Sequence, residues 1–184
     1  MMKMIKIARL ALAGFMLVLL ATSVAQAAPE FYVSITGASQ GPFNGEVLRK
    51  GFEGKIAGIA FDYSVVSPRD AASGQATGKR VHKPIRVKKA WGASSTQLFS
   101  ALTKNEMLTT VVIDFFSVDP NGVMTLDHTI KLTNAFVASI SHNSESQGTA
   151  IASLPTETVE FVFQQIELLN HRTKTAAMDS MLVP

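Results

Sequence analysis

The feature of the sequence that most restricts its fold is a long alternation of apolar and polar residues between Leu126 and Ile140. The apolar set occupies even positions, interrupted at His128 and Asn134, and consists of Leu126, Ile130, Leu132, Phe136, Ala138 and Ile140. A period of two is typical of a strand with one buried face. A strand of this length must bend around a barrel or extend beyond it. We therefore expect a mainly β protein.

Shorter stretches with the same period predict strands at 31–36, 55–66, 81–91 and 159–168, and a β-branched and aromatic run predicts another at 109–118. The tail has no clear period, but its short apolar groups within 176–183 could supply a closing strand. In 55–66 the apolar set is Ile59, Phe61, Tyr63 and Val65, and in 81–91 it is Val81, Ile85, Val87 and Trp91. The parity of 159–168 changes at Gln164 and Gln165, which predicts a β-bulge. Residues 119–122 predict a tight reversal with Gly122 at positive φ.

One helix is expected at 95–104. Ser94 and Gln97 have the spacing of a capping box, and the apolar residues that follow have helical spacing, at Leu98, Ala101 and Leu102. The connections are otherwise compatible with hairpins, which predicts an antiparallel barrel or sandwich. A small barrel of six to eight strands with one flanking helix is preferred, because closure removes exposed strand edges.

The first 27 residues have the three parts of an export signal. Lys3, Lys6 and Arg9 form a basic start, residues 10–21 are apolar, and residues 25–27 read Ala-Gln-Ala, a small-residue cleavage site. The apolar part is short for a membrane span, although extension to Ala28 keeps an uncleaved anchor open. We expect a signal peptide at 1–27, a barrel domain at 28–184 and no membrane span after cleavage.

The net charge of +3 belongs to this leader. It holds three of the 17 basic residues and no acidic one, which leaves 14 basic against 14 acidic residues in the domain. A neutral domain gives no global electrostatic reason to expect a nucleic-acid partner.

The sequence contains no recognisable catalytic or metal-binding pattern. Cysteine is absent, and no two of the four histidines have metal-ligand spacing. His128 and His142 share the apolar parity of the long strand but would lie roughly 45 Å apart along it, so they are expected to be hydrogen-bonded structural residues. We predict no enzyme activity, no cofactor and no metal.

One segment is strongly basic. It contains Lys79, Arg80, Lys83, Arg86, Lys88 and Lys89, with His82 among them. Such a segment could be a solvated strand face, or could bind an anionic ligand, nucleic acid or an acidic patch on another subunit. Aromatic residues are not interleaved with the charges, since Trp91 stands alone, so a subunit contact is favoured over nucleic acid.

Several segments together resemble the haemolysin-coregulated protein family, the tube subunits of type VI secretion. They are 31–37, 73–84 with its Arg-Val-His-Lys-Pro sequence, 97–102, 159–167 and 177–179. The resemblance covers nearly all of residues 30–184. It implies a small antiparallel barrel with one helix, six-membered rings that stack into a hollow tube, and no catalysis.

The resemblance also implies partners: further copies of the chain, the type VI sheath and tip proteins, and secreted effectors sheltered in the lumen. In that picture residues 67–78 form an extended loop that reaches a neighbouring subunit or ring. The candidate interface residues are Arg69, Lys79, Arg80, His82 and Lys83.

The leader departs from the usual family pattern, in which the chain begins just before the first strand and assembles in the cytoplasm. A used signal would make the protein periplasmic, and a start at Val24 would leave it cytoplasmic before type VI export. The alternative function is an exported β-barrel binding module for a small molecule or anionic polymer. It predicts an enclosed pocket and binding that weakens on charge reversal at Arg86 and Lys88.

Overall fold

The computed structural model describes residues 30–119, 121–144 and 155–181, so the expected signal at 1–27 lies outside the described residues, as does most of the linker after the long strand. The elements are β1 (Glu30–Gly37), β2 (Gly41–Pro42), β3 (Ile56–Asp62), β4 (Val65–Val66), β5 (Val81–His82), β6 (Ile85–Ala90), α2 (Ala93–Thr103), β7 (Leu108–Val118), β8 (Met124–Asn143), β9 (Thr156–Asn170) and β10 (Thr175–Ser180).

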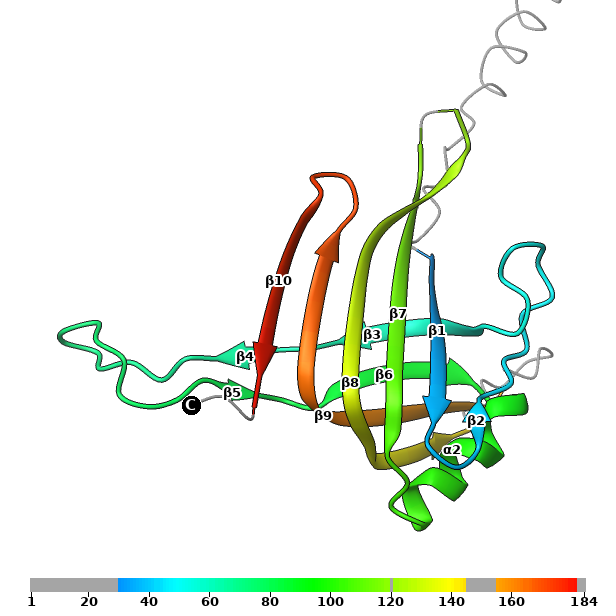
Figure 1. Cartoon of the computed structure of the whole chain (residues 1–184), viewed down its shortest axis with the longest axis horizontal. Helices are drawn as coiled ribbons and strands as arrows, with labels where there is room; N and C mark the ends of the chain where they lie inside the picture. Colours follow the sequence, from blue (N-terminus) through cyan, green and yellow to red (C-terminus); the bar gives the residue numbers. More distant parts are fainter. Residues whose placement is uncertain (1–29, 120, 145–154, 182–184) are drawn as a thin grey trace, which may run out of the picture.

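Six strands close into an antiparallel barrel, as the sequence predicts. The pairing runs β1-β3-β6-β9-β8-β7 and returns to β1 (Figure 1). In addition, β2 pairs with β1 and β10 pairs with β9. The core is aliphatic and aromatic, with Val33, Ile35, Ile56, Ile85, Val111, Leu132 and Phe161 all at most 3% exposed. Closure leaves the barrel strands without free edges, and β10 remains as an added edge strand.

The long strand β8 is present, but its apolar parity does not continue unbroken. Ile130 and Leu132 are buried on the even positions, whereas beyond them Ala135 and Val137 are buried and Ala138 is exposed. The reason is Asn134, whose φ of 50° turns the backbone. The expected parity change at Gln164 in β9 is present and faces Asn134, whose side-chain amide donates to Gln164 Oε1 at 3.0 Å. The predicted β-bulge at Gln164 and Gln165 is wrong, because the β8–β9 pairs on either side of them keep one register. The register shift lies instead between Val137 and Ser139 of β8.

The single helix among the described residues, α2, has its N-cap two residues before the predicted one. Gly92 is the N-cap, and its N–H donates to Ser95 Oγ at 3.0 Å, so the Ser94–Gln97 capping box is wrong. Ser94 is fully buried, and the Gln97 side chain accepts from the Asn44 N–H at 2.8 Å. Leu98 and Ala101 are buried beneath the helix as expected. No helix in the described part of the chain has the length and apolar character needed to cross a membrane.

The predicted strand 55–66 is broken into β3 and β4, because β3 leaves the barrel at Asp62. Ile59 is bulged out of the β3–β6 pairing and is 55% exposed, contrary to the expected parity. Val81 and Trp91 are likewise exposed rather than inward. The tight reversal is confirmed at Gly122, with φ of 81°, and the closing strand is confirmed as β10.

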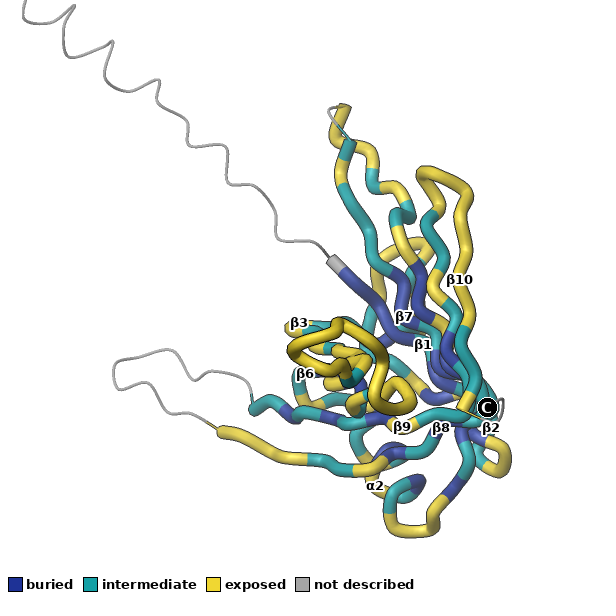
Figure 2. The backbone as a smooth tube through the Cα atoms, turned by 90° about the vertical axis from the view of Figure 1, so that its left-hand side faces the viewer, coloured by how far each residue is buried: buried dark blue, intermediate teal, exposed yellow. Residues whose placement is uncertain are grey.

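Residues 63–84 form a projecting hairpin rather than an unstructured loop. The β4–β5 ladder pairs Val65 with His82 and Val66 with Val81, and an isolated bridge joins Arg69 to Ala76 near the tip. The hairpin extends away from the barrel in Figure 1 and is largely exposed in Figure 2, where it points toward the viewer.

Candidate subunit interface

The base of the hairpin is tied to β10 by a group of four side chains, which we call the hairpin anchor: Tyr63, Arg80, His82 and Asp179. The Tyr63 hydroxyl lies 2.5 Å from His82 Nδ1, and His82 Nε2 lies 2.9 Å from Asp179 Oδ2. Arg80 donates two hydrogen bonds to the Asp179 carboxylate and a third to the Ser180 carbonyl oxygen. Both arms of the hairpin are thereby joined to one carboxylate of the C-terminal strand.

The charges within the anchor stabilise its ionised carboxylate. Hydrogen bonds from Arg80, assisted by His82, lower the pKa of Asp179 from 3.8 to about 2. The same contact raises the pKa of Arg80. Burial, followed by the negative charge of Asp179, raises the pKa of Tyr63, so the tyrosine stays a protonated donor.

This arrangement predicts an acid-resistant contact. Because the folded pKa of Asp179 lies below its ordinary value, the anchor contributes its full stability above about pH 4 and loses it as the pH falls through about 2. An NMR titration of the Asp179 carboxyl carbon should have its midpoint near 2, and Arg80→Ala should move that midpoint upward. An unchanged midpoint in the variant would contradict the assigned cause.

The other basic residues do not form one continuous patch with the anchor. Arg86 pairs with Glu160 at 2.7 Å, and Lys89 is buried against Glu157 at 2.8 Å. Arg69 donates to the Gly74 carbonyl within the tip at 3.0 Å. Of the five candidate interface residues, Arg80 and His82 bind to β10, while Arg69, Lys79 and Lys83 are exposed on the projecting hairpin and do not contact β10 through a hydrogen bond or ion pair in the described structure.

Sequence reasoning missed Asp179 as a functional partner. It stands 99 residues from Arg80 along the chain, and nothing in local periodicity connects them. The one signal for it is its place in the tail segment 177–179 that carries the family resemblance.

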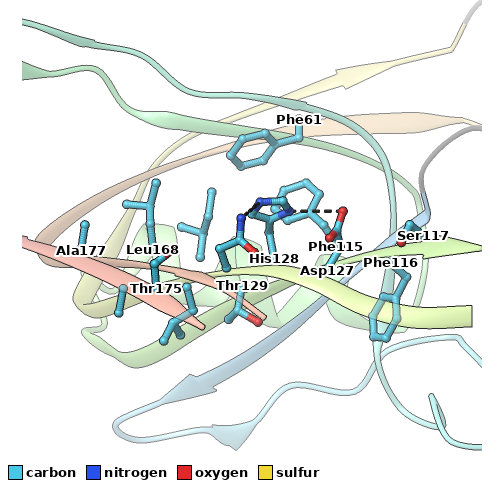
Figure 3. Close-up of a pocket in the computed structure, with 14 residues that line it drawn as sticks. Phe61, Phe115, Phe116, Ser117, Asp127, His128, Thr129, Leu168, Thr175 and Ala177 are labelled. Atoms are coloured by element: carbon cyan, nitrogen blue, oxygen red, sulfur yellow. Dashed lines mark hydrogen bonds and ion pairs between the residues drawn. The ribbon is translucent and has the colours of Figure 1, made fainter. Parts of the chain in front are cut away.

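A cavity of about 650 Å³ lies where the upper parts of β7, β8, β9 and β10 face β3. Figure 3 shows Phe61 on one side, with Thr129, Leu168 and Thr175 on strands across from it. His128 lines the cavity, 3.0 Å from the Asn170 amide and 3.4 Å from Asp127. The lining is therefore mostly apolar with a polar end.

A second cavity of about 480 Å³ lies beside the start of α2, lined by Trp91, Phe99 and His142. His142 contacts the buried Glu157 at 3.1 Å. His128 and His142 thus occupy different cavities and each has a hydrogen-bond partner. Within the described ranges no three histidine or carboxylate side chains are grouped as metal ligands.

Most of the described chain matches a known protein family. The family described as type VI secretion system effector, Hcp, matches residues 32–169.

The chain belongs to the Hcp family.

Among its relatives, the Major exported protein of Pseudomonas aeruginosa is 32% identical over 165 residues, which are 83% of this chain and 95% of that protein. The crystal structure of an Hcp protein has a TM-score of 0.77 at 25% identity and covers 83% of this chain and 99% of its own. The secreted protein Hcp3 of Pseudomonas aeruginosa has a TM-score of 0.69 at 25% identity, covering 83% and 98%.

The family match includes nearly all of the six barrel strands, the hairpin and the Arg-Val-His-Lys-Pro sequence, but Asp179 lies beyond it. The anchor therefore joins a segment inside the Hcp match to the strand that follows it. The resemblance that these segments carry is confirmed.

Proposed function

We propose that this protein is a non-catalytic, ring-forming subunit of a type VI secretion tube. Membership of the Hcp family, described by its role in type VI secretion, supports the general assignment. The observation that supports assembly is the hairpin 63–84, which projects from the barrel. On this hairpin Val65, Val66 and Val81 are each about half exposed. Apolar side chains on a narrow projecting ribbon gain stability when another surface covers them.

The partner surface is a neighbouring copy, in the same ring or in the next. Arg69, Lys79 and Lys83 place three positive charges along the exposed hairpin, and these charges suit a contact with carboxylates of the neighbour. A head-to-tail contact of this kind closes into a ring when the rotation between copies allows it. Six copies would form a hollow ring, and stacked rings a tube that carries effectors and meets the sheath and tip proteins.

Charge reversal tests this interface. The variant Arg69→Glu, Lys79→Glu, Lys83→Glu is expected to lose at least nine-tenths of the rings seen by negative-stain electron microscopy and light scattering, because it replaces attraction by repulsion. The matched control reverses Lys50, Lys131 and Lys174, which are exposed elsewhere. A wild-type chain that stays monomeric at high concentration would count against the tube assignment. Rings that survive in the hairpin variant would count against this interface.

The cellular route forms part of the proposal. We infer export through the signal at 1–27, with a periplasmic mature chain that begins at Ala28. The N-terminal residue of the protein recovered from each cell compartment decides this. A cytoplasmic chain that starts at position 24 would overturn the exported route and leave type VI export as the route out of the cell.

The 650 Å³ cavity favours one second candidate, a binding module for a small, mainly apolar molecule. Neither Arg86 nor Lys88 lines this cavity, so it does not match the expected anionic-polymer site. A calorimetric ligand screen of the protein against Ala177→Trp, which narrows the cavity, tests it. A ligand that binds the unmodified protein and Ala177→Trp with equal affinity would show that it does not bind in this cavity.

A further inference from the structure

The contacts that hold the hairpin 63–84 to the rest of the described chain are few and converge on one residue. Its own ladder consists of two pairs and one bridge, and a two-stranded ribbon of that size is not stable alone. Every ion pair recorded from residues 63–84 to another described element ends on Asp179 of β10. The hairpin is also held by the Arg80 hydrogen bond to the Ser180 carbonyl oxygen at 3.0 Å, and by Phe163, whose ring packs against Tyr63 and His82 with centroids 6.3 and 5.7 Å apart.

We propose that Asp179 is a positioning residue that fixes the direction in which the hairpin projects. The guanidinium of Arg80 meets the carboxylate through two donors, and such a fork restrains orientation as well as distance. His82 adds a second restraint from the same arm. Its other ring nitrogen accepts from Tyr63 on the opposite arm. A continuous chain of hydrogen bonds therefore links Tyr63 on one arm of the hairpin, His82 on the other arm and Asp179 on β10.

Packing at this junction is incomplete. A cavity of about 80 Å³ lies beside His82 and is bounded by Phe163, Met181, Lys83, Pro84 and Val162. Side chains that border a void are less restrained by their neighbours than those in a filled core. The direction of the hairpin therefore depends on the hydrogen bonds and charges of the anchor.

The position of Asp179 separates this role from a role in barrel stability. It lies on β10, outside the closed barrel, and its side chain is 28% exposed. The β10–β9 backbone pairs do not need the carboxylate, and partly exposed ion pairs contribute little to global stability. Loss of the carboxylate should loosen the hairpin and leave the barrel folded.

The importance of hairpin direction for assembly rests on the proposed ring function, but the positioning itself does not. Hydrogen exchange of the full chain, at a concentration where light scattering finds a single species, measures how firmly the anchor holds the hairpin, because a ribbon of this size opens when its support is lost. In Asp179→Asn we expect the amides of Thr77 and Lys83, which donate to Pro68 and Ser64, to exchange at least tenfold faster. Barrel amides in β7 and the denaturation midpoint should remain unchanged.

Two further variants sharpen the test. Asp179→Glu keeps the charge and should restore part of the protection. Glu160→Gln breaks the comparable Arg86 pair and should leave the hairpin amides unchanged. Unaltered hairpin exchange in Asp179→Asn would overturn the proposal, as would an equal acceleration throughout the barrel.

Ring yield then distinguishes the two proposals. Faster hairpin exchange with fewer rings supports both. Faster exchange with a normal ring yield supports the anchor and overturns the hairpin interface. A wild-type chain without rings removes the tube function and leaves the exchange result to decide the anchor.

Discussion

Replacement of Glu157 by alanine is expected to lower the free energy of unfolding by about 3–5 kcal/mol. Glu157 is 0% exposed, and its Oε1 accepts from Lys89 Nζ and from Ser95 Oγ, each at 2.8 Å. Lys89 is itself 2% exposed. The substitution would leave a buried ammonium without its counter-charge, and the loss of that compensation is the main cause of the effect. Chemical denaturation at one protein concentration measures it.

Two controls separate the buried pair from ion pairs in general. Glu160→Ala removes the exposed partner of Arg86 and should cost less than about 1 kcal/mol. The double variant Lys89→Met, Glu157→Leu removes both charges and should recover most of the stability lost in Glu157→Ala. If Glu157→Ala costs no more than Glu160→Ala, the buried-charge explanation is wrong.

Local patterns in the sequence were sufficient to predict most of the barrel. Strand periodicity placed β1, β8 and β9, because each has a face buried by its neighbours. A run of β-branched and aromatic residues placed β7. The tail has no clear period and β10 has no buried face, so only its short apolar groups indicated this strand. The break in β8 was not predictable, since it depends on one residue, Asn134, in a left-handed conformation that asparagine adopts only occasionally. Periodicity also could not show where β3 leaves the barrel, because the same alternation continues into β4.

The sequence does contain a signal for the buried pair of Lys89 and Glu157. Lys89 has the parity of Ile85 and Val87, and Glu157 has the parity of Val159 and Phe161, so each lies on an inward face. The two residues are direct partners across β6 and β9. The density of basic residues around Lys89 indicates a charged surface, because a count of charge takes no account of which face of the strand a side chain occupies.

The candidate interface was predictable in place but not in detail. The resemblance located the hairpin, whereas the roles of Arg80 and His82 depend on β10, which approaches them only after the chain has completed the barrel. A carboxylate 97 residues from His82 can be assigned to it only from three-dimensional structure.

Phe31→Ala is expected to cost about 3–5 kcal/mol, measured by equilibrium unfolding. Phe31 is 5% exposed and stacks on Phe115 with ring centroids 5.3 Å apart, while Phe61 meets its edge at 6.2 Å. Its ring also covers Gly58 on β3, where an added Cβ would lie 1.9 Å from Phe31 Cε2. The two residues therefore compete for one volume.

This competition predicts a specific coupling between the two positions. Gly58→Ala alone should destabilise by about 1–3 kcal/mol, because Phe115 and Phe61 prevent the Phe31 ring from moving aside. In the Phe31→Ala background the space is free, so the same glycine substitution should be neutral or stabilising. Phe99→Ala, at a phenylalanine that is 55% exposed, serves as the control and should have a small effect. Additive costs in the double-mutant cycle would show that Phe31 and Gly58 do not share this space.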